Sequence, residues 1–204
     1  MPPSFDWSGS KNLKRAEVLY PAPHRFVDAA GTAIGYADEV VFPVRITPER
    51  EGEAVELKLA VGYGLCKTLC IPNEAELSLA LPADARADKG DGALLATFLA
   101  RVPKPAEAGA LPAVREVENR LDGAKPELVI DALFPPAASG SDLFIEAPDI
   151  FVPVPKPIGP LADGRQSFAV IFASPEEAAG IKGKPLTLTL VSDAGSREMI
   201  WTAE

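Results

Sequence analysis

Apolar and polar residues alternate along two runs near the middle of the chain, a pattern typical of half-buried β-strands. The apolar positions are Val55, Leu57, Leu59, Val61 and Tyr63 in the first run, then Leu77, Leu79 and Leu81 in the second. The pattern predicts a β-hairpin with strands over 54–65 and 74–81. Both cysteines of the chain, Cys66 and Cys70, fall where one predicted strand ends and the next begins.

Shorter apolar runs predict further strands before this hairpin. Strands are expected over 16–20 and 40–46, and Pro43 inside the second of these indicates an edge strand or a bulge. Residues 20–26 should be extended, because a residue before proline avoids the α region. Residues 28–38, which contain two glycines and two aspartates, predict a loop.

The second half of the chain has the same β character. A helix is predicted over 93–101, where Leu94, Leu95, Phe98 and Leu99 share one face, and residues 102–110 have the composition of a linker. Strands are then expected over 113–118, 127–130, 143–146, 166–172, 186–191 and 198–201, a spacing that suits a small β-sandwich. We therefore expect an all-β chain of two domains, 1–101 with its trailing helix and 111–204.

Composition and charge narrow the classes of partner. The 204 residues include 21 prolines and 16 glycines, and the net charge is −9 with a pI near 4.8. No basic stripe is visible, so nucleic acid is not expected as a partner, and no apolar run is long enough to span a bilayer. Residues 1–4 lack the features of a signal peptide, while Phe5 and Trp7 lie very near the start. We interpret the chain as a truncated piece whose leader is missing.

The cysteine pair is the main candidate for chemistry, and the residues alone leave three hypotheses open. A structural staple would gain little here, because so short a loop contributes only about 2 kcal/mol. A redox dithiol needs a thiolate and a nearby second thiol, and Lys67 could favour the thiolate. Copper(I) binding is the third hypothesis, since thiolates select that ion, whereas two cysteines are too few for a closed zinc site.

Other candidate residues carry weaker signals. His24 is the only histidine and is interpreted as a surface or packing residue, because no nucleophile motif accompanies it. Tyr36 could cover or hydrogen-bond the cysteine hairpin, and an ordinary loop tyrosine is the competing interpretation. The aspartates Asp149, Asp163 and Asp193 show no metal-loop spacing and are interpreted as turn formers.

Three ordered motifs resemble a known family. They are Tyr20-Pro21-Ala22-Pro23-His24-Arg25-Phe26, then Gly35-Tyr36-Ala37-Asp38-Glu39-Val40-Val41-Phe42-Pro43-Val44, then Cys66-Lys67-Thr68-Leu69-Cys70-Ile71-Pro72. Residues 4 to about 101 resemble the periplasmic N-terminal domain of the thiol:disulfide interchange protein DsbD, and more closely its ScsB-like relatives. The second half fits this family only by position and β character.

The resemblance implies tandem immunoglobulin-like β-sandwich domains with one short helix between them, in the periplasm. It implies a protein-disulfide reductase that is a fragment of a larger membrane protein and uses no cofactor. Cys66 and Cys70 would be the redox pair, with Cys70 forming the mixed disulfide and Cys66 resolving it. Electrons would come from the membrane and thioredoxin-like domains of the parent protein. They would pass to periplasmic thioredoxin-fold proteins of the disulfide isomerase or cytochrome c maturation type, or to copper-resistance thiol proteins.

The sequence departs from the family in three respects. Three residues separate the cysteines here, where DsbD has five. The stretch that matches the protective cap loop of DsbD, Asp28-Ala29-Ala30-Gly31, has alanines in place of the shielding aromatic. Ile34 or Tyr36 would then be the cap, or the pair is less shielded. The upstream strands, signal peptide and downstream membrane and thioredoxin-like parts of the family are not in this sequence.

Overall fold

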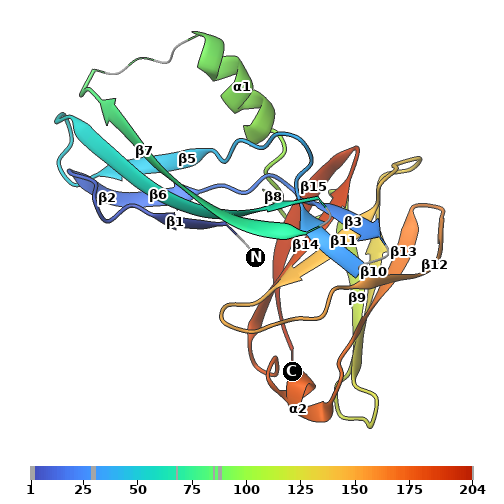
Figure 1. The fold of residues 1–204 in the computed structure, drawn as a ribbon. Helices are drawn as coiled ribbons and strands as arrows, with labels where there is room; N and C mark the ends of the chain where they lie inside the picture. The colour runs from blue at the N-terminus through green and yellow to red at the C-terminus, as the bar shows by residue number, and fades with distance from the viewer. Residues whose placement is uncertain (1–2, 29–30, 68, 85, 87–88, 204) are drawn as a thin grey trace. The chain divides into compact units, whose positions relative to one another are not determined.

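The computed structural model describes residues 3–28, 31–67, 69–84, 86 and 89–203. The chain is mostly β-strand and has two short helices, arranged in two compact units (Figure 1). The first unit contains Met1–Leu19 and Val40–Leu99, and the second contains Tyr20–Glu39 and Ala100–Glu204. The expected all-β fold with a helix between its two halves is confirmed.

The first unit is built on a long hairpin. Strands β6 (Val55–Cys66) and β7 (Cys70–Leu81) pair antiparallel, and β1 (Ser4–Asp6) adds to β6 to give the order β1-β6-β7. Strands β2 (Leu13–Val18) and β5 (Val44–Pro48) form a separate antiparallel pair. Helix α1 (Lys89–Leu99) follows the hairpin and buries Phe98.

The hairpin has one apolar face and one polar face, as the alternating sequence predicts. Val55 and Leu57 are buried, and their cross-strand partners are Leu81 and Leu79. The opposite face carries Glu56, Lys58, Glu74 and Glu76, because successive side chains in a strand point to opposite faces. The predicted hairpin is confirmed, although β7 begins at Cys70 and not at residue 74.

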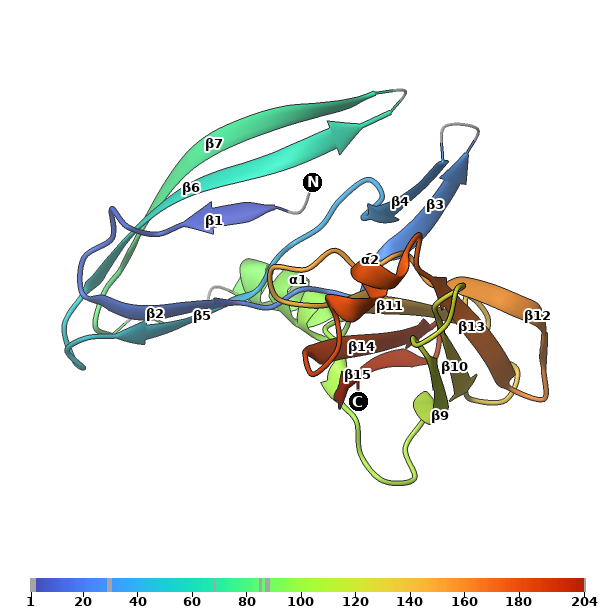
Figure 2. The same ribbon diagram turned by 90° about the horizontal axis from the view of Figure 1, so that it is seen from below.

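The second unit is a β-sandwich with a well-formed core (Figures 1 and 2). One sheet has the order β12-β13-β10-β9 and the other β11-β14-β15-β8. Phe134 and Phe168 meet edge to face in the core, with ring centroids 6.4 Å apart. The strands are β8 (Lys104–Pro105), β9 (Ala113–Arg120), β10 (Glu127–Leu133), β11 (Asp142–Glu146), β12 (Lys156–Ala162), β13 (Arg165–Ile171), β14 (Pro185–Ser192) and β15 (Gly195–Thr202).

A second hairpin belongs to this unit, although its residues lie in the first half of the sequence. Strands β3 (His24–Asp28) and β4 (Gly31–Gly35) pair antiparallel, with His24 opposite Gly35 and Asp28 opposite Gly31. The predicted loop over 28–38 is therefore wrong for Gly31–Gly35. A glycine at each end of so short a strand gives it the composition of a loop, and pairing with β3 decides its conformation.

Several element boundaries differ from the predictions for identifiable reasons. The helix predicted over 93–101 spans Lys89–Leu99, because Gly90 and Gly92 hide its first turn in the sequence. Strand β12 was not predicted; it contains two prolines, which are tolerated because β12 is an edge strand. Helix α2 (Pro175–Ala179) was also missed, although the Ser174 hydroxyl caps it by accepting from Glu177 N at 3.3 Å.

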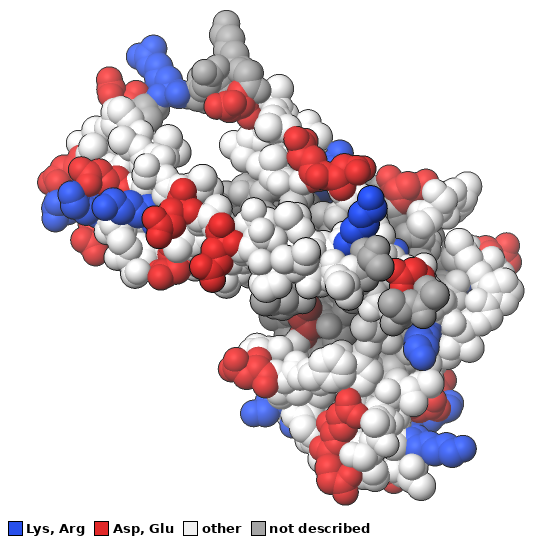
Figure 3. All heavy atoms as spheres, viewed as in Figure 1, with Lys and Arg blue, Asp and Glu red and all other residues white. Residues whose placement is uncertain are grey.

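The division into domains at 1–101, 102–110 and 111–204 stays a prediction. None of the helices in the described part of the chain is both long enough and apolar enough to cross a membrane. On the face shown in Figure 3, basic side chains are scattered among acidic ones and form no continuous patch.

Candidate functional site

The two cysteines form a disulfide at the tip of the β6–β7 hairpin. Cys66 pairs directly with Cys70 as the last pair of the ladder, the Sγ–Sγ distance is 2.09 Å, and the Cα atoms lie 4.0 Å apart. Inside the turn, Lys67 N donates to Leu69 O at 3.2 Å. Both cysteines are exposed. A visiting thiolate therefore meets the disulfide at the end of a ribbon and not inside a core.

The register of the hairpin decides which face carries the disulfide. The ladder runs without a shift from the Val55–Leu81 pair to the Cys66–Cys70 pair. Alternation then puts both sulfur atoms on the polar face, with the Gly64–Pro72 pair as their nearest neighbours along it. The disulfide thus continues the solvent-facing side of the ribbon.

Three large apolar side chains surround the tip. Leu65, Leu69 and Ile71 are 58%, 77% and 61% exposed, and Leu65 lies opposite Ile71 on the face away from the sulfur atoms. We call these three residues the apolar rim. Lys67 is the only charged residue between positions 61 and 73. The end of the hairpin is therefore apolar and nearly uncharged in a chain whose net charge is −9.

The two residues expected to cap the disulfide belong to the second unit. Ile34 lies on β4 opposite Arg25 and is half-exposed. The Tyr36 hydroxyl donates to the carbonyl of Pro21 at 2.8 Å. Burial raises the pKa of Tyr36 to about 12, and the carboxylate of Glu146 adds to the shift. Shielding of the cysteines by Ile34 or Tyr36 stays a prediction, and Ala29 and Ala30 of the matching cap stretch lie outside the described residues.

The weaker candidates from the sequence lie where a surface residue and turn formers are expected. His24 is the exposed first residue of β3. Asp149 and Asp163 have φ values of 58° and 51°, which are typical of turn positions. Asp193 accepts hydrogen bonds from the backbone N and the hydroxyl of Ser139, and these bonds lower the pKa of its carboxyl group.

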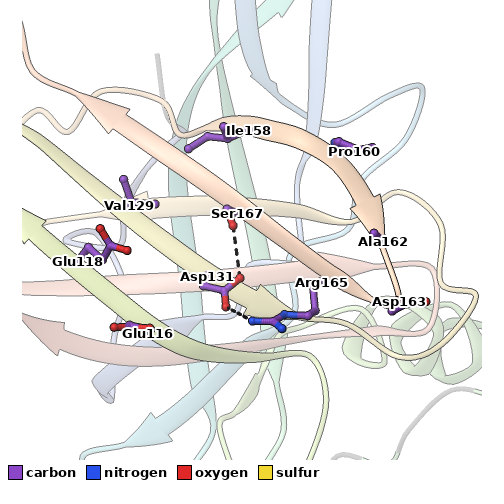
Figure 4. A pocket seen from close by; sticks show the side chains of 10 residues that line it. All are labelled: Glu116, Glu118, Val129, Asp131, Ile158, Pro160, Ala162, Asp163, Arg165 and Ser167. Atoms are coloured by element: carbon purple, nitrogen blue, oxygen red, sulfur yellow. Dashed lines mark hydrogen bonds and ion pairs between the residues drawn. The ribbon is translucent and has the colours of Figure 1, made fainter.

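A hollow of about 470 Å³ lies on one sheet of the second unit and was not predicted (Figure 4). Its central carboxylate, Asp131, lies 3.1 Å from Arg165 and 3.7 Å from Arg115, and it accepts from the Ser167 hydroxyl at 3.3 Å. The charge of Asp131 is thus largely compensated. Across the described ranges, no three His, Cys, Asp or Glu side chains are grouped so that they could hold a metal ion.

The fold and the site define the class of protein: an all-β, immunoglobulin-like chain with a disulfide at the exposed tip of a hairpin. Residues 1–82 match the family described as thiol:disulfide interchange protein DsbD, N-terminal. The expected resemblance is therefore confirmed for this part of the chain. The match supports an activity of the thiol–disulfide oxidoreductase type and, in general terms, an interaction with thioredoxin-like partners.

A solved structure shares the fold along the whole chain. It is the crystal structure of the N-terminal periplasmic domain of ScsB from Proteus mirabilis, with a TM-score of 0.68 and 20% sequence identity. The similarity covers 100% of this chain and 77% of that chain. No curated protein matches the sequence.

Proposed function

We propose that this chain is a periplasmic thiol:disulfide interchange module that passes electrons through Cys66 and Cys70 to disulfide-bonded partner proteins. The observation that carries the proposal is the exposed disulfide at the end of the β6–β7 hairpin. The match of residues 1–82 to the DsbD N-terminal family supports the reaction type. The periplasmic origin of the ScsB domain that shares its fold supports the compartment.

The exchange would proceed in two displacement steps. In the reduced chain, the Cys70 thiolate attacks one sulfur of the partner disulfide, which forms a mixed disulfide and releases the other partner sulfur as a thiolate. The Cys66 thiolate then attacks Cys70 Sγ, which reforms the Cys66–Cys70 bond and releases the second partner thiolate. Two electrons pass to the partner. A thioredoxin-like dithiol of the parent membrane protein returns the chain to its reduced form by the same steps in reverse.

The position of the bond also argues against a purely structural role. The cysteines close a ring of only five residues, so the disulfide contributes about 2 kcal/mol through the unfolded chain. The ladder of β6 and β7 already holds the same residues side by side. The exposed surroundings of the bond, in which Lys67 is the one charged residue between positions 61 and 73, fit a protein thiol partner better than a staple.

A pair of matched cysteine variants tests the proposal. Cys66→Ala keeps the attacking thiol and loses the resolving one, so it should accumulate a mixed disulfide with a thioredoxin-fold partner. Cys70→Ala should form little of this complex and should lose electron transfer. Both outcomes are read by mass spectrometry after acid quenching and alkylation. Undiminished transfer by Cys70→Ala would end the proposal.

A titration distinguishes Cu(I) binding by the same two thiolates from the proposed redox function. Reduced protein is titrated with Cu(I) against a competing chelator, and the reduction potential of the pair is measured. A potential above about −300 mV together with partner exchange supports the redox function. Tight stoichiometric binding that is lost in Cys66→Ser, without exchange activity, would favour a copper carrier instead.

A further inference from the structure

Gly64 is a glycine that neither a register shift, nor a left-handed backbone, nor a close contact among the described residues explains. It lies inside the 12-residue strand β6, where glycine weakens a strand because it has no side chain to pack. A glycine in such a position commonly marks a β-bulge, a sharp bend or a place where another backbone approaches closely.

A bulge is excluded by the register, since the β6–β7 ladder pairs Gly64 with Pro72 without any shift. The backbone of Gly64 is not in the left-handed region that favours glycine. No heavy atom of the described residues outside its two chain neighbours lies within 4 Å of a Cβ built at Gly64. Gly62, two residues earlier, differs: a Cβ there would lie 2.7 Å from the Ser4 hydroxyl oxygen of β1, so a side chain at that position would have to displace the Ser4 side chain.

The open space at Gly64 adjoins the disulfide. Gly64 and Pro72 are the pair next to Cys66 and Cys70 on the face that carries the sulfur atoms. A side chain at position 64 would stand beside the Cys66–Cys70 bond, and its absence leaves a shallow, side-chain-poor strip along the approach to the sulfurs. Pro72 has no backbone N–H to offer an added strand. A visiting chain would therefore lie across this face and not extend the sheet at β7.

We infer that Gly64 marks where the backbone next to the reactive cysteine of a protein dithiol comes against the hairpin during exchange. This inference rests on the proposed function and adds the place and manner of partner contact. The partner it fits is a thioredoxin-type protein with an uncharged surface around its reactive cysteine, because Lys67 is the only charge among residues 61–73. A small-molecule thiol has no backbone beside its sulfur, so its approach to the disulfide does not depend on the strip.

The test compares a protein reductant with a small one on three variants of the full chain. Gly64→Ala and Gly64→Val fill the strip in steps. Ala80→Val is the matched control, because Ala80 is exposed on the same face of the same hairpin, far along the strand from the disulfide. The rate of reduction of Cys66–Cys70 is measured with reduced thioredoxin and with dithiothreitol, by quenching and alkylation.

Gly64→Val should slow reduction by thioredoxin roughly tenfold or more, with Gly64→Ala between it and the original chain, since a small displacement of reacting groups costs a large factor in rate. Reduction by dithiothreitol should change less than about twofold, and Ala80→Val should leave both rates unchanged. An unaltered thioredoxin rate in Gly64→Val would overturn the inference, as would equal slowing by both reductants. The first result would leave the proposed function intact, since the Cys70→Ala experiment tests that function separately.

Discussion

Arg25 and Asp142 form a two-point ion pair inside the second unit, with Nη2 2.6 Å from Oδ1 and Nε 2.9 Å from Oδ2. The two side chains are only 15% and 18% exposed. The guanidinium also lies 5.6 Å from the centre of the Phe144 ring and donates to Leu143 O at 3.3 Å. This pair attaches strand β3 to strand β11, so the segment that precedes the cysteine hairpin in sequence is fixed by residues of the second half.

Replacing Asp142 with alanine should destabilise the second unit and loosen the β3–β4 hairpin. The Arg25 charge would remain buried without its partner, which we expect to cost about 3 kcal/mol, near the lower end for broken buried ion pairs. Amide hydrogen exchange in Arg25–Val27 and Thr32–Ile34 should accelerate. The control is Glu17→Ala, which breaks the exposed Arg45–Glu17 pair and should cost less than about 1 kcal/mol. Equal losses in the two variants would contradict this account.

Removal of the disulfide should leave the fold intact. The double variant Cys66→Ser with Cys70→Ser loses a bond that closes a five-residue ring, so the free energy of unfolding should fall by about 2 kcal/mol or less. Chemical denaturation followed by circular dichroism measures the change. A chain that no longer folds would show that the bond is a structural staple, against the proposed function.

The apolar rim should matter for protein partners. Leu65→Ser and Ile71→Ser remove exposed apolar surface at the hairpin tip, on the face away from the sulfur atoms. A protein partner that surrounds the tip would contact this surface, so reduction by thioredoxin should slow about three- to tenfold, at about 1 kcal/mol for each partly buried contact. The control is Leu77→Ser, which removes an equally exposed leucine from β7, six residues beyond Ile71, and this variant should react as the original chain does. Normal rates in both rim variants would exclude a docking role for these two side chains.

The raised pKa of Tyr36 predicts that the stability of the folded chain falls at alkaline pH. Its pKa is raised above the ordinary value of 10 to about 12, chiefly by burial, so the folded chain keeps this proton when the unfolded chain has lost it. The stabilisation is complete below pH 10 and is lost as the pH rises towards 12, by about 1–2 kcal/mol after allowance for partial exposure.

Absorbance of tyrosinate near 295 nm measures this titration directly. The chain has three tyrosines, and Tyr36→Phe should remove the step near pH 12. The variant should also lose the part of the stability decrease between pH 10 and 12 that belongs to Tyr36. A step removed near pH 10 instead would contradict the assigned environment of the hydroxyl.

The core of the second unit gives a stability test that leaves the exchange site untouched. Phe168 is fully buried against Phe134, so Phe168→Ala should cost about 3–5 kcal/mol through lost burial and the cavity left behind. Reduction of Cys66–Cys70 by dithiothreitol should keep its rate if residues 1–101 form a domain of their own. Thermal unfolding and the reduction rate measured on the same variant give both answers.

Two element boundaries follow from local sequence signals alone. Ser174-Pro175-Glu176-Glu177 has the form of a helix start, with a capping hydroxyl, proline in the first turn and acidic residues near the positive end. Strand β5 begins only after Pro43, whose ring removes a backbone donor, although its carbonyl still accepts from Leu19 N at 2.8 Å. Both boundaries depend only on residues that are neighbours in sequence, so the sequence alone is enough to predict them.

The sequence by itself determined the hairpin, its apolar and polar faces, and the presence of both cysteines at its tip, because a period of two residues depends only on local strand geometry. The tertiary structure alone decided where β3 and β4 belong, since the ion pair that holds them joins Arg25 to a residue 117 positions later. It also decided that a Cβ at Gly62 would meet the Ser4 hydroxyl, whereas a Cβ at Gly64 would meet no heavy atom of the described residues within 4 Å. Such contacts depend on distances between segments, and no pattern along a single strand contains that information.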